Sequence, residues 1–593
     1  MYELLMASLV AVAGLVFHQT SLAATNYWVG PGVGLNNWSS TGNWSLGTVP
    51  GPGDYVKFTD LGKTTLYSNV NNVVDGGFAG VIGSLYYANT NGFHTTSISP
   101  GGTLMVTSNL IAGIDSANGT FTRTDIVAGA SATLIVSNAA ANILVRDLQG
   151  PNHGGNITLD MSGLNNFTAI VENLSVGNST VISNGTGSLI LARNNDITVL
   201  GPGTPAILIG TGGTNLSGSA SGAGTLLLGQ NNTIHADTIT VGIGLVSAQL
   251  AFNTNFSDPS GTFRGANGTS RIAAFNIGDS PNFVSTSMVD FSGGTVDLQA
   301  DVMQVGRVLI DVAAQSNVGA RGTLSFNKGI INVNTLTLGL NLWTNFSFGE
   351  GFVNVQGGAK LVANTAIELG KSVTTNGYPG SINRNRGSLN ISGGTVLASM
   401  INANYFSANN TITMTNGTLV VTNTMGPGIN NFTMVDSALT LPAAGVSSAI
   451  VTNFITGGSG NVVNIGALNG LNAYPTQVSL IKYTGAIGGA GFNLGLGTLP
   501  APTFTGYLSN NAVNSSVDLV LLARPFLYGI GTSGGQFSFN VASDSNGVVN
   551  ILTSTNLSSW SLLTTLTNTA GSTSLQYPTT NFPQQFFRAQ ETQ

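Results

Sequence analysis

The predicted fold follows from one stretch of the sequence, Ser388-Leu389-Asn390-Ile391-Ser392-Gly393-Gly394-Thr395-Val396. Leu389 and Ile391 alternate with polar neighbours, which is the pattern of a β-strand with one buried face. The Gly393-Gly394 pair permits a tight turn, after which a second strand begins. Related strand-and-turn stretches occur elsewhere in the chain. They predict turn glycines at Gly102, Gly294, Gly358 and Gly394.

A second pattern, apolar–any–apolar–glycine, repeats along the chain at a nearly constant spacing. From Gly177 to the six following copies, the steps are 33, 32, 36, 28, 33 and 31 residues. Counting back one unit from Gly177 gives Arg146, and counting back a second unit gives Gly113. The predicted repeat glycines are therefore Gly113, Gly177, Gly210, Gly242, Gly278, Gly306, Gly339 and Gly370.

A period of this size is typical of a repeat array whose units must stack to bury their apolar faces. Each unit contains several short strand patterns and almost no helix-forming sequence. The sequence therefore predicts an all-β protein, a parallel β-helix or solenoid with units of about 30 to 32 residues. One coil with a loop per unit is the favoured geometry, and two coils per unit is the alternative.

The composition limits the classes of function. Only 7% of residues are charged, whereas 42% are apolar, which is enough to build a stacked core. The net charge is −6 and the sequence has no basic patch, so nucleic acid is not an expected partner. The chain has no cysteine, which excludes disulfides, thiolate metal sites and a cysteine nucleophile.

Five segments are predicted along the chain. Residues 1–23 resemble a signal peptide because an apolar run, Leu4 to Phe17, precedes the small-residue site Ser21-Leu22-Ala23. No Lys or Arg precedes the run, so the true start of translation stays open. The other segments are an N-terminal cap (24–60), the repeats (61–405), the last coils with a C-terminal cap (406–523) and a small antiparallel β-sandwich (525–593). A hairpin is predicted at Asn546-Gly547 of the sandwich.

Three of the five tryptophans, Trp28, Trp38 and Trp44, lie within the predicted N-terminal cap. We expect them to close the open edge of the first coil, which would otherwise be exposed to aggregation. The alternative is a platform on which sugars stack.

The chain resembles secreted bacterial proteins that carry the autotransporter-associated β-strand repeat. The resemblance is carried by the repeated strand-glycine pattern, by Asn43-Trp44, Pro50-Gly51 and Gly53-Asp54 near the start, and by Leu480-Ile481-Lys482-Tyr483 near the end of the array. It implies a β-solenoid like an autotransporter passenger, with a small β module after it. It also implies secretion or display on a Gram-negative-type bacterium. The final module is too short to form the terminal membrane barrel of true autotransporters, so self-translocation through such a barrel is not expected.

Few residues suggest catalysis. The histidines are scattered, and Gly531-Thr532-Ser533-Gly534-Gly535 is followed by a strand pattern rather than the helix that a nucleophile elbow needs. Asp279 and Arg307 each follow a repeat glycine and should be neighbours on adjacent coils. We expect an exposed ion pair, contributing at most about 1 kcal/mol. A catalytic or calcium-binding groove is the alternative. No cofactor is expected.

These observations favour a secreted, non-enzymatic structural or adhesin-like protein of the cell surface or extracellular matrix. Its expected partners are a second copy of itself, through head-to-tail stacking, or an extracellular polysaccharide. No transmembrane segment is expected in the mature chain. A polysaccharide-binding or polysaccharide-degrading β-helix, a lyase or glycoside hydrolase, is the second hypothesis, and it would need carboxylates clustered on one face.

Overall fold

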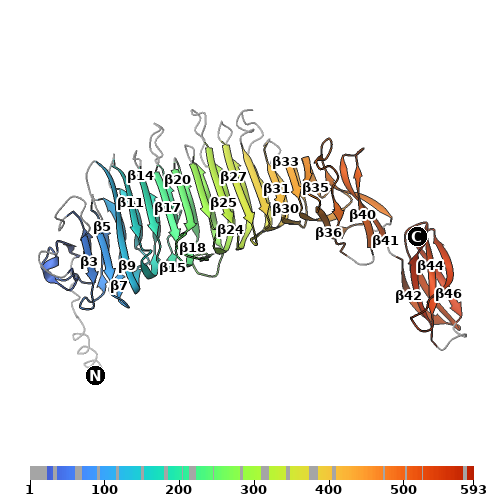
Figure 1. The fold of residues 1–593 in the computed structure, drawn as a ribbon, viewed down its shortest axis with the longest axis horizontal. Coiled ribbons are helices and arrows are strands. Elements are labelled where there is room, and N and C mark those ends of the chain that lie inside the picture. The colour runs from blue at the N-terminus through green and yellow to red at the C-terminus, as the bar shows by residue number, and fades with distance from the viewer. Residues whose placement is uncertain are drawn as a thin grey trace, which may run out of the picture.

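The chain folds into a long parallel β-solenoid followed by a small antiparallel module (Figure 1). In the described residues 41 strands form one continuous winding sheet, and the only helical element is the short 3-10 turn η1 (Thr41–Asn43). This confirms the predicted all-β parallel solenoid. The computed structural model describes residues 23–30, 36–60, 70–89, 94–114, 119–148, 153–178, 185–202, 205–212, 222–244, 246–280, 285–308, 319–341, 348–372, 385–403, 409–471, 475–500, 504–523, 525–578 and 584–592.

The strands stack on three parallel faces, which the chain visits in the order face 1, face 2, face 3. Face 1 consists of β3 (Val70–Val74), β6 (His94–Ile98), the start of β9 (Gly119–Ser137), β11 (His153–Asp160), β14 (Gly185–Ile190), β17 (Gly222–Leu228), β20 (Val246–Phe252), β23 (Ser285–Asp290), β25 (Gly319–Phe326), β27 (Phe348–Gln356), β29 (Arg386–Ser392), β31 (Thr411–Thr415), the ends of β33 (Met425–Val435) and β35 (Ala449–Gly457), and β38 (Gly488–Gly489).

Face 2 consists of β4 (Val81–Ile82), β7 (Thr103–Val106), the end of β9, β12 (Leu164–Val171), β15 (Asn194–Val199), β18 (Asn231–Ala236), β21 (Ser260–Arg264), the starts of β24 (Thr295–Val308), β26 (Gly329–Asn341), β28 (Lys360–Leu369) and β30 (Thr395–Ala403), then β32 (Thr418–Val421), β34 (Ala438–Ala444), β36 (Val462–Asn469) and β39 (Gly495–Leu496).

Face 3 consists of β1 (Thr25–Tyr27), β2 (Tyr55–Phe58), β5 (Ser84–Tyr87), β8 (Leu110–Ile114), β10 (Asn142–Leu148), β13 (Asn173–Asn178), β16 (Ile207–Thr211), β19 (Thr238–Ile243), β22 (Ile272–Ser280), the ends of β24, β26, β28 and β30, the starts of β33 and β35, and β37 (Thr476–Lys482).

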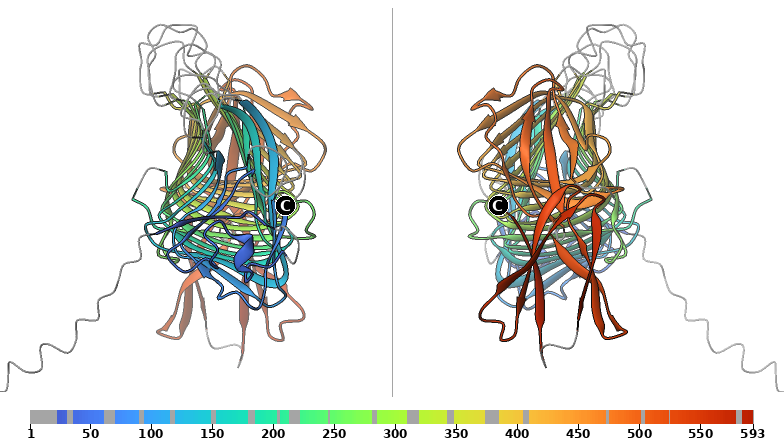
Figure 2. Two further views of the ribbon diagram at one scale, coloured as in Figure 1. Left: turned by 90° about the vertical axis from the view of Figure 1, so that its left-hand side faces the viewer. Right: turned by 90° about the vertical axis from the view of Figure 1, so that its right-hand side faces the viewer.

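One sequence unit forms one coil. On face 3, Leu174 pairs with Ile207, Ile207 with Ile239, and Ile239 with Phe275. These partners are separated in sequence by one repeat unit, so the alternative of two coils per unit is wrong. Viewed along the rod, successive coils superimpose (Figure 2).

The repeat glycines mark a bend at the end of the face 3 strands. Gly177, Gly210, Gly242, Gly278, Gly306, Gly339 and Gly370 have φ between 59° and 85°, a region that favours glycine. They lie in one column, because Val176 pairs with Ile209 and Asn178 with Thr211, and the same register continues up the rod. In the unit before Gly177, Arg146 takes this conformation instead, with φ 61°. Arg146 is an extra residue there, so Gly113 pairs with Asp147.

A second row of glycines faces this column from the strands of face 1. A Cβ atom on Gly187 would lie 2.5 Å from Gly177 N, and one on Gly224 would lie 2.2 Å from Gly210 N. Gly322, Gly351 and Gly387 stand in the same relation to Gly306, Gly339 and Gly370. The end of face 3 and the beginning of face 1 therefore meet backbone to backbone, and a side chain on either strand would separate them.

The turn glycines lie between faces 1 and 2. The positive φ belongs to the first glycine of each pair, with values of 86° at Gly293 and 77° at Gly393, and Gly101 and Gly357 behave alike. At the second position, Gly294 and Gly394 are limited by space, because a Cβ there would meet Phe252 and Val355 at 2.6 and 2.7 Å. Gly102 would meet Ser99 O at 2.8 Å, whereas Gly358 has open space.

Apolar side chains fill the rod, and amide side chains form ladders along its outside. Leu189, Leu226 and Leu250 are among the buried residues of one continuous core. Outside, Asn231 Nδ2 donates to Asn194 Oδ1 at 2.8 Å, and Asn194 Nδ2 donates to Asn166 Oδ1 at 3.2 Å. These ladders follow from the register, since identical positions of adjacent coils lie about 4.8 Å apart.

The coils shorten beyond residue 403. Ser388 pairs with Thr411, Thr411 with Asn431, and Asn431 with Asn453, which are steps of 23, 20 and 22 residues. In this region the chain therefore uses fewer residues to pass from face 3 back to face 1 than it does in the earlier coils. Shortening explains why the 32-residue spacing is lost here although the parallel stack continues.

The last coil is closed by an antiparallel sheet, called here the closing sheet. It consists of β37, β41 (Ser516–Ala523) and β40 (Phe504–Asn511), with β41 in the middle. Val478, Leu480, Leu519 and Leu521 point inward and belong to the core of the rod. Ile481, Val517 and Leu508 also belong to this core. Gln477, Ser479 and Asp518 lie on the outward side, where they line a hollow.

The C-terminal module contains six strands in two antiparallel sheets. They are β42 (Phe526–Ser533), β43 (Gln536–Ala542) and β46 (Ser572–Pro578) in one sheet, and β44 (Gly547–Ser554), β45 (Ser561–Asn568) and β47 (Phe586–Glu591) in the other. The predicted hairpin at Asn546-Gly547 is wrong, because β43 and β44 pair with different partners and belong to different sheets. The turn of a hairpin lies instead at Gly534-Gly535, where Ser533 pairs with Gln536.

Nearly all of the predicted signal peptide, residues 1–22, lies outside the described residues. Among the residues that are described, no helix has the length and apolar character needed to cross a membrane.

Candidate functional site

The tryptophans at the N-terminal end are buried rather than available to a ligand. Trp28 and Trp38 have no exposed surface and Trp44 retains 2%. Trp44 packs edge-to-face on both of the others, with ring centroids 5.0 and 5.2 Å apart. Trp38 Nε1 donates to Asn72 Oδ1, and Trp44 Nε1 donates to the Trp38 carbonyl. A sugar could not stack on these rings, so they serve as the core of the first coil.

Asp279 and Arg307 are neighbours on face 3 and form the predicted ion pair. Arg307 Nε donates to Asp279 Oδ1 at 2.8 Å, Arg307 Nη2 donates to Oδ2, and Nη1 donates to Gln304 Oε1. Asp279 is buried, so the expectation of an exposed pair is wrong. Burial raises the pKa of Asp279, while the hydrogen bonds and charge of Arg307 oppose that rise. The pair links two adjacent coils.

The described residues contain no cluster of side chains that is arranged to bind a metal ion. Among them, no three His, Cys, Asp or Glu side chains are placed to hold a metal ion. His94 is buried beside the Thr59 carbonyl, and His235 lies on face 2 next to Thr198. Gly534 and Gly535 of the Gly-x-Ser-x-Gly match form the hairpin turn described above.

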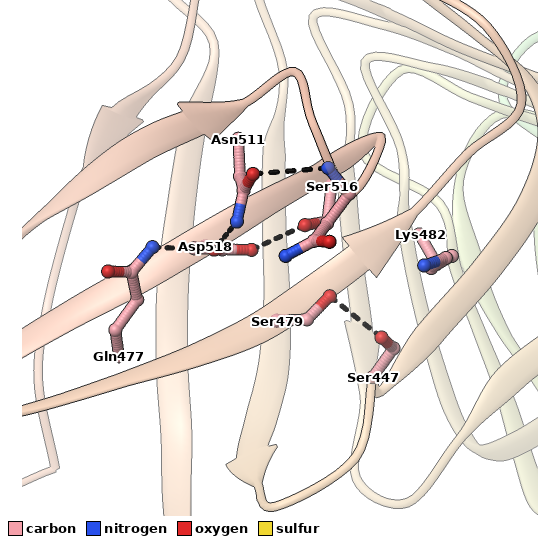
Figure 3. A pocket seen from close by; sticks show the side chains of 8 residues that line it. Ser447, Gln477, Ser479, Lys482, Asn511, Ser516 and Asp518 are labelled. Carbon is pink, nitrogen blue, oxygen red and sulfur yellow. Dashed lines mark hydrogen bonds between the residues drawn. The ribbon is translucent and has the colours of Figure 1, made fainter.

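The outward face of the closing sheet carries the clearest cluster of polar side chains around a hollow (Figure 3). The hollow has a volume of about 450 Å³. Its lining residues come from β37, β40, β41, the turn between β40 and β41, and the connection between β34 and β35. They are Ser447, Gln477, Ser479, Lys482, Asn511, Asn514, Ser516 and Asp518.

Asp518 is the acidic centre of this hollow and is itself buried. Ser516 Oγ donates to Asp518 Oδ1 at 2.6 Å, while Gln477 Nε2 and Asn511 Nδ2 donate to Oδ2 at 2.7 and 2.8 Å. Burial alone would raise the pKa of Asp518. These three hydrogen bonds and the positive charge of Lys482 outweigh it and bring the pKa below its usual value. Asp518 is therefore a fixed, ionised acceptor rather than a proton donor.

The strand register places an exposed aromatic ring on the same face. Along the three strands, Tyr507 lies opposite Val520 and Val520 opposite Gln477, whereas Ser509, Asp518 and Ser479 form the next row. Tyr507 is 55% exposed, and Lys482 at the rim is also exposed. Ser447 Oγ donates to Ser479 Oγ at 2.7 Å on the far side of the hollow. The face thus combines an aromatic surface with hydroxyl, carboxamide, carboxylate and ammonium groups.

Comparison of the chain with protein-family models, with curated proteins and with solved structures gives no match. The assignment of the candidate site therefore rests on the geometry of its residues alone.

The sequence analysis did not single out this face. A signal was present in the alternation Ser516-Val517-Asp518-Leu519-Val520 and in Tyr507-Leu508-Ser509, both typical of strands with one outward face. The sequence alone could not show that β41 pairs with β37, because the two strands are far apart in sequence. Their pairing is determined by where the solenoid ends.

Proposed function

We propose that this chain is a secreted, non-enzymatic structural protein of the bacterial cell surface or extracellular matrix, with an adhesin-like role. The observation that supports the proposal is the stack of one-unit coils with three continuous faces. Such a stack provides length and a regular surface rather than a single enclosed site. The resemblance to autotransporter-associated repeats supports the extracellular, Gram-negative-type location.

The outer surface supports a mechanical role through contacts between coils. Arg264 Nη2 lies 2.6 Å from Asp297 Oδ2, and Arg321 lies against Glu350 on the next coil. Asn390 Nδ2 donates to Asn354 Oδ1 at 2.9 Å. Each contact joins adjacent coils, so the side chains reinforce the backbone ladder along the axis of the rod.

Head-to-tail association is part of the proposal, and the N-terminal end limits how it can occur. The outer edge of β1 is occupied, since Ser45 N donates to the Tyr27 carbonyl and Val29 N donates to the Asn43 carbonyl. Two rods would therefore meet there through side chains and loops rather than by adding a strand.

The test has two parts, one on the source cells and one on the purified chain from Ala24 onward. In protease-accessibility and fractionation experiments on the source cells, we expect the natural protein outside the cell. In negative-stain electron microscopy we expect rods, and a rise in the fraction of end-to-end pairs with concentration would support self-association. Incubation with neutral and acidic polysaccharides should release no reducing ends and no unsaturated uronates. Cleavage of any of them would overturn the non-enzymatic role and favour the polysaccharide-degrading alternative.

A further inference from the structure

We propose that the outward face of the closing sheet binds neutral sugar units of a polysaccharide, with Tyr507 as the stacking surface and the Asp518 hollow as the hydrogen-bonding part. The site belongs to the adhesin-like scaffold proposed above and depends on that role. It would give the rod a ligand at its C-terminal end.

The first support is the arrangement of the face. Residues two apart on an antiparallel strand are about 6.8 Å apart, so the Tyr507 row and the Asp518 row are separated by roughly the width of one sugar ring. An aromatic ring offers its face to the C–H groups of a pyranose, while its neighbours can reach the hydroxyls. Tyr507 is exposed enough to do so, unlike the three tryptophans at the other end.

The second support is the hydrogen-bonding capacity of the hollow. Asp518 is held by three donors, yet each carboxylate oxygen can accept two hydrogen bonds, and Oδ1 accepts only that from Ser516 among its described contacts. The Gln477 side chain donates a hydrogen bond to Asp518 through Nε2, and its Oε1 is a further acceptor. Asn514 adds a carboxamide and Lys482 adds a donor. Sugar hydroxyls both donate and accept, so they match this mixture.

The third support is the charge of the lining, which contains one carboxylate and one ammonium group. A single carboxylate that already accepts three hydrogen bonds is a poor site for a divalent cation. Calcium, for example, prefers six or more oxygen ligands. The lone ammonium of Lys482 is similarly insufficient for a polyanion. A neutral polyhydroxyl chain is therefore the favoured occupant.

The experiment measures binding of the chain from Ala24 onward to three neutral polysaccharides, a soluble β-glucan, a galactomannan and dextran, by affinity electrophoresis and calorimetry. We expect at least one of them to bind. Tyr507→Ala should weaken that binding at least tenfold, and Asn514→Ala should weaken it about threefold. The matched control is Tyr55→Ala, an exposed tyrosine near the opposite end, which should bind like the wild type. Unchanged thermal unfolding shows that each variant is folded.

Absence of binding to all three polymers would overturn the saccharide site, as would equal binding by the wild type and Tyr507→Ala. Polygalacturonate is measured beside the three neutral polymers. If it alone binds, and Lys482→Ala abolishes that binding, the neutral ligand class is overturned. None of these results affects the scaffold role, which fails instead if polysaccharide is cleaved or the protein stays inside the cell.

Discussion

The two ends of the rod protect its edges with opposite chemistry. At the N-terminal end, Trp28, Trp38 and Trp44 point inward and form an aromatic core beneath short loops. At the C-terminal end, an antiparallel sheet covers the last coil, with apolar residues inward and Asp518, Gln477 and Tyr507 outward. Both solutions prevent uncontrolled strand addition. The tryptophans of the first end are buried, whereas the second end places Asp518, Gln477 and Tyr507 around an outward hollow, so the C-terminal end is the one suited to a ligand.

The largest effect is expected from removal of an aromatic ring at the N-terminal end. Trp38→Ala should destabilise the protein by about 3 to 5 kcal/mol, because a fully buried ring is lost and Asn72 loses its hydrogen-bond donor. Denaturant unfolding followed by tryptophan fluorescence would measure it, since three of the five tryptophans report on this end. Trp560→Ala in the C-terminal module is the matched control. An equal loss in both variants would contradict a special role for the aromatic core.

A smaller effect is expected from the buried acid at the C-terminal end. Asp518→Asn keeps the shape but replaces one acceptor oxygen by a donor, so at least one of its three donors loses its partner. We expect a loss of about 2 kcal/mol in the closing sheet. Hydrogen exchange of peptides covering residues 476–523 would measure it. Asp258→Asn, which removes an exposed ion pair with Lys328, should change stability by less than about 0.5 kcal/mol.

Acidic pH should destabilise the closing sheet through protonation of Asp518. The folded pKa of Asp518 lies below its unfolded value, so its stabilisation is fully present above the unfolded pKa of about 3.9 and is lost as the pH falls through the folded value. Exchange in residues 476–523, corrected for intrinsic rates, should therefore accelerate as the pH falls below about 4. Asp518→Asn should lack this dependence. If the variant kept it, another group would be responsible.

The smallest effect on stability is expected at the exposed ring of the closing sheet. Tyr507→Ala should change the free energy of unfolding by less than about 0.5 kcal/mol, because more than half of the side chain is exposed. Thermal unfolding would measure it beside Trp38→Ala. A loss approaching that of Trp38→Ala would mean that both ends depend on buried aromatic packing, and the contrast between them would disappear.

Local patterns in the sequence were sufficient to predict the solenoid. The repeat glycines adopt positive φ at one bend per unit, and inward Leu, Ile and Val alternate with polar residues on every face. Both features are properties of a few consecutive residues, so a constant spacing predicts coils that stack in register. The ladder partners Asp279 and Arg307 followed from the same spacing.

Three features were decided only by the tertiary structure. The second glycine row, including Gly187 and Gly322, lies at varying distances along the chain from the first, so no fixed period predicts it. Burial of Asp279 depends on packing around face 3 rather than on its position after a glycine. The candidate site exists because β41 pairs with β37 and β40 at the end of the rod. Sequence spacing predicts contacts between equivalent positions of repeated units. Contacts between non-equivalent strands depend instead on where the stack ends.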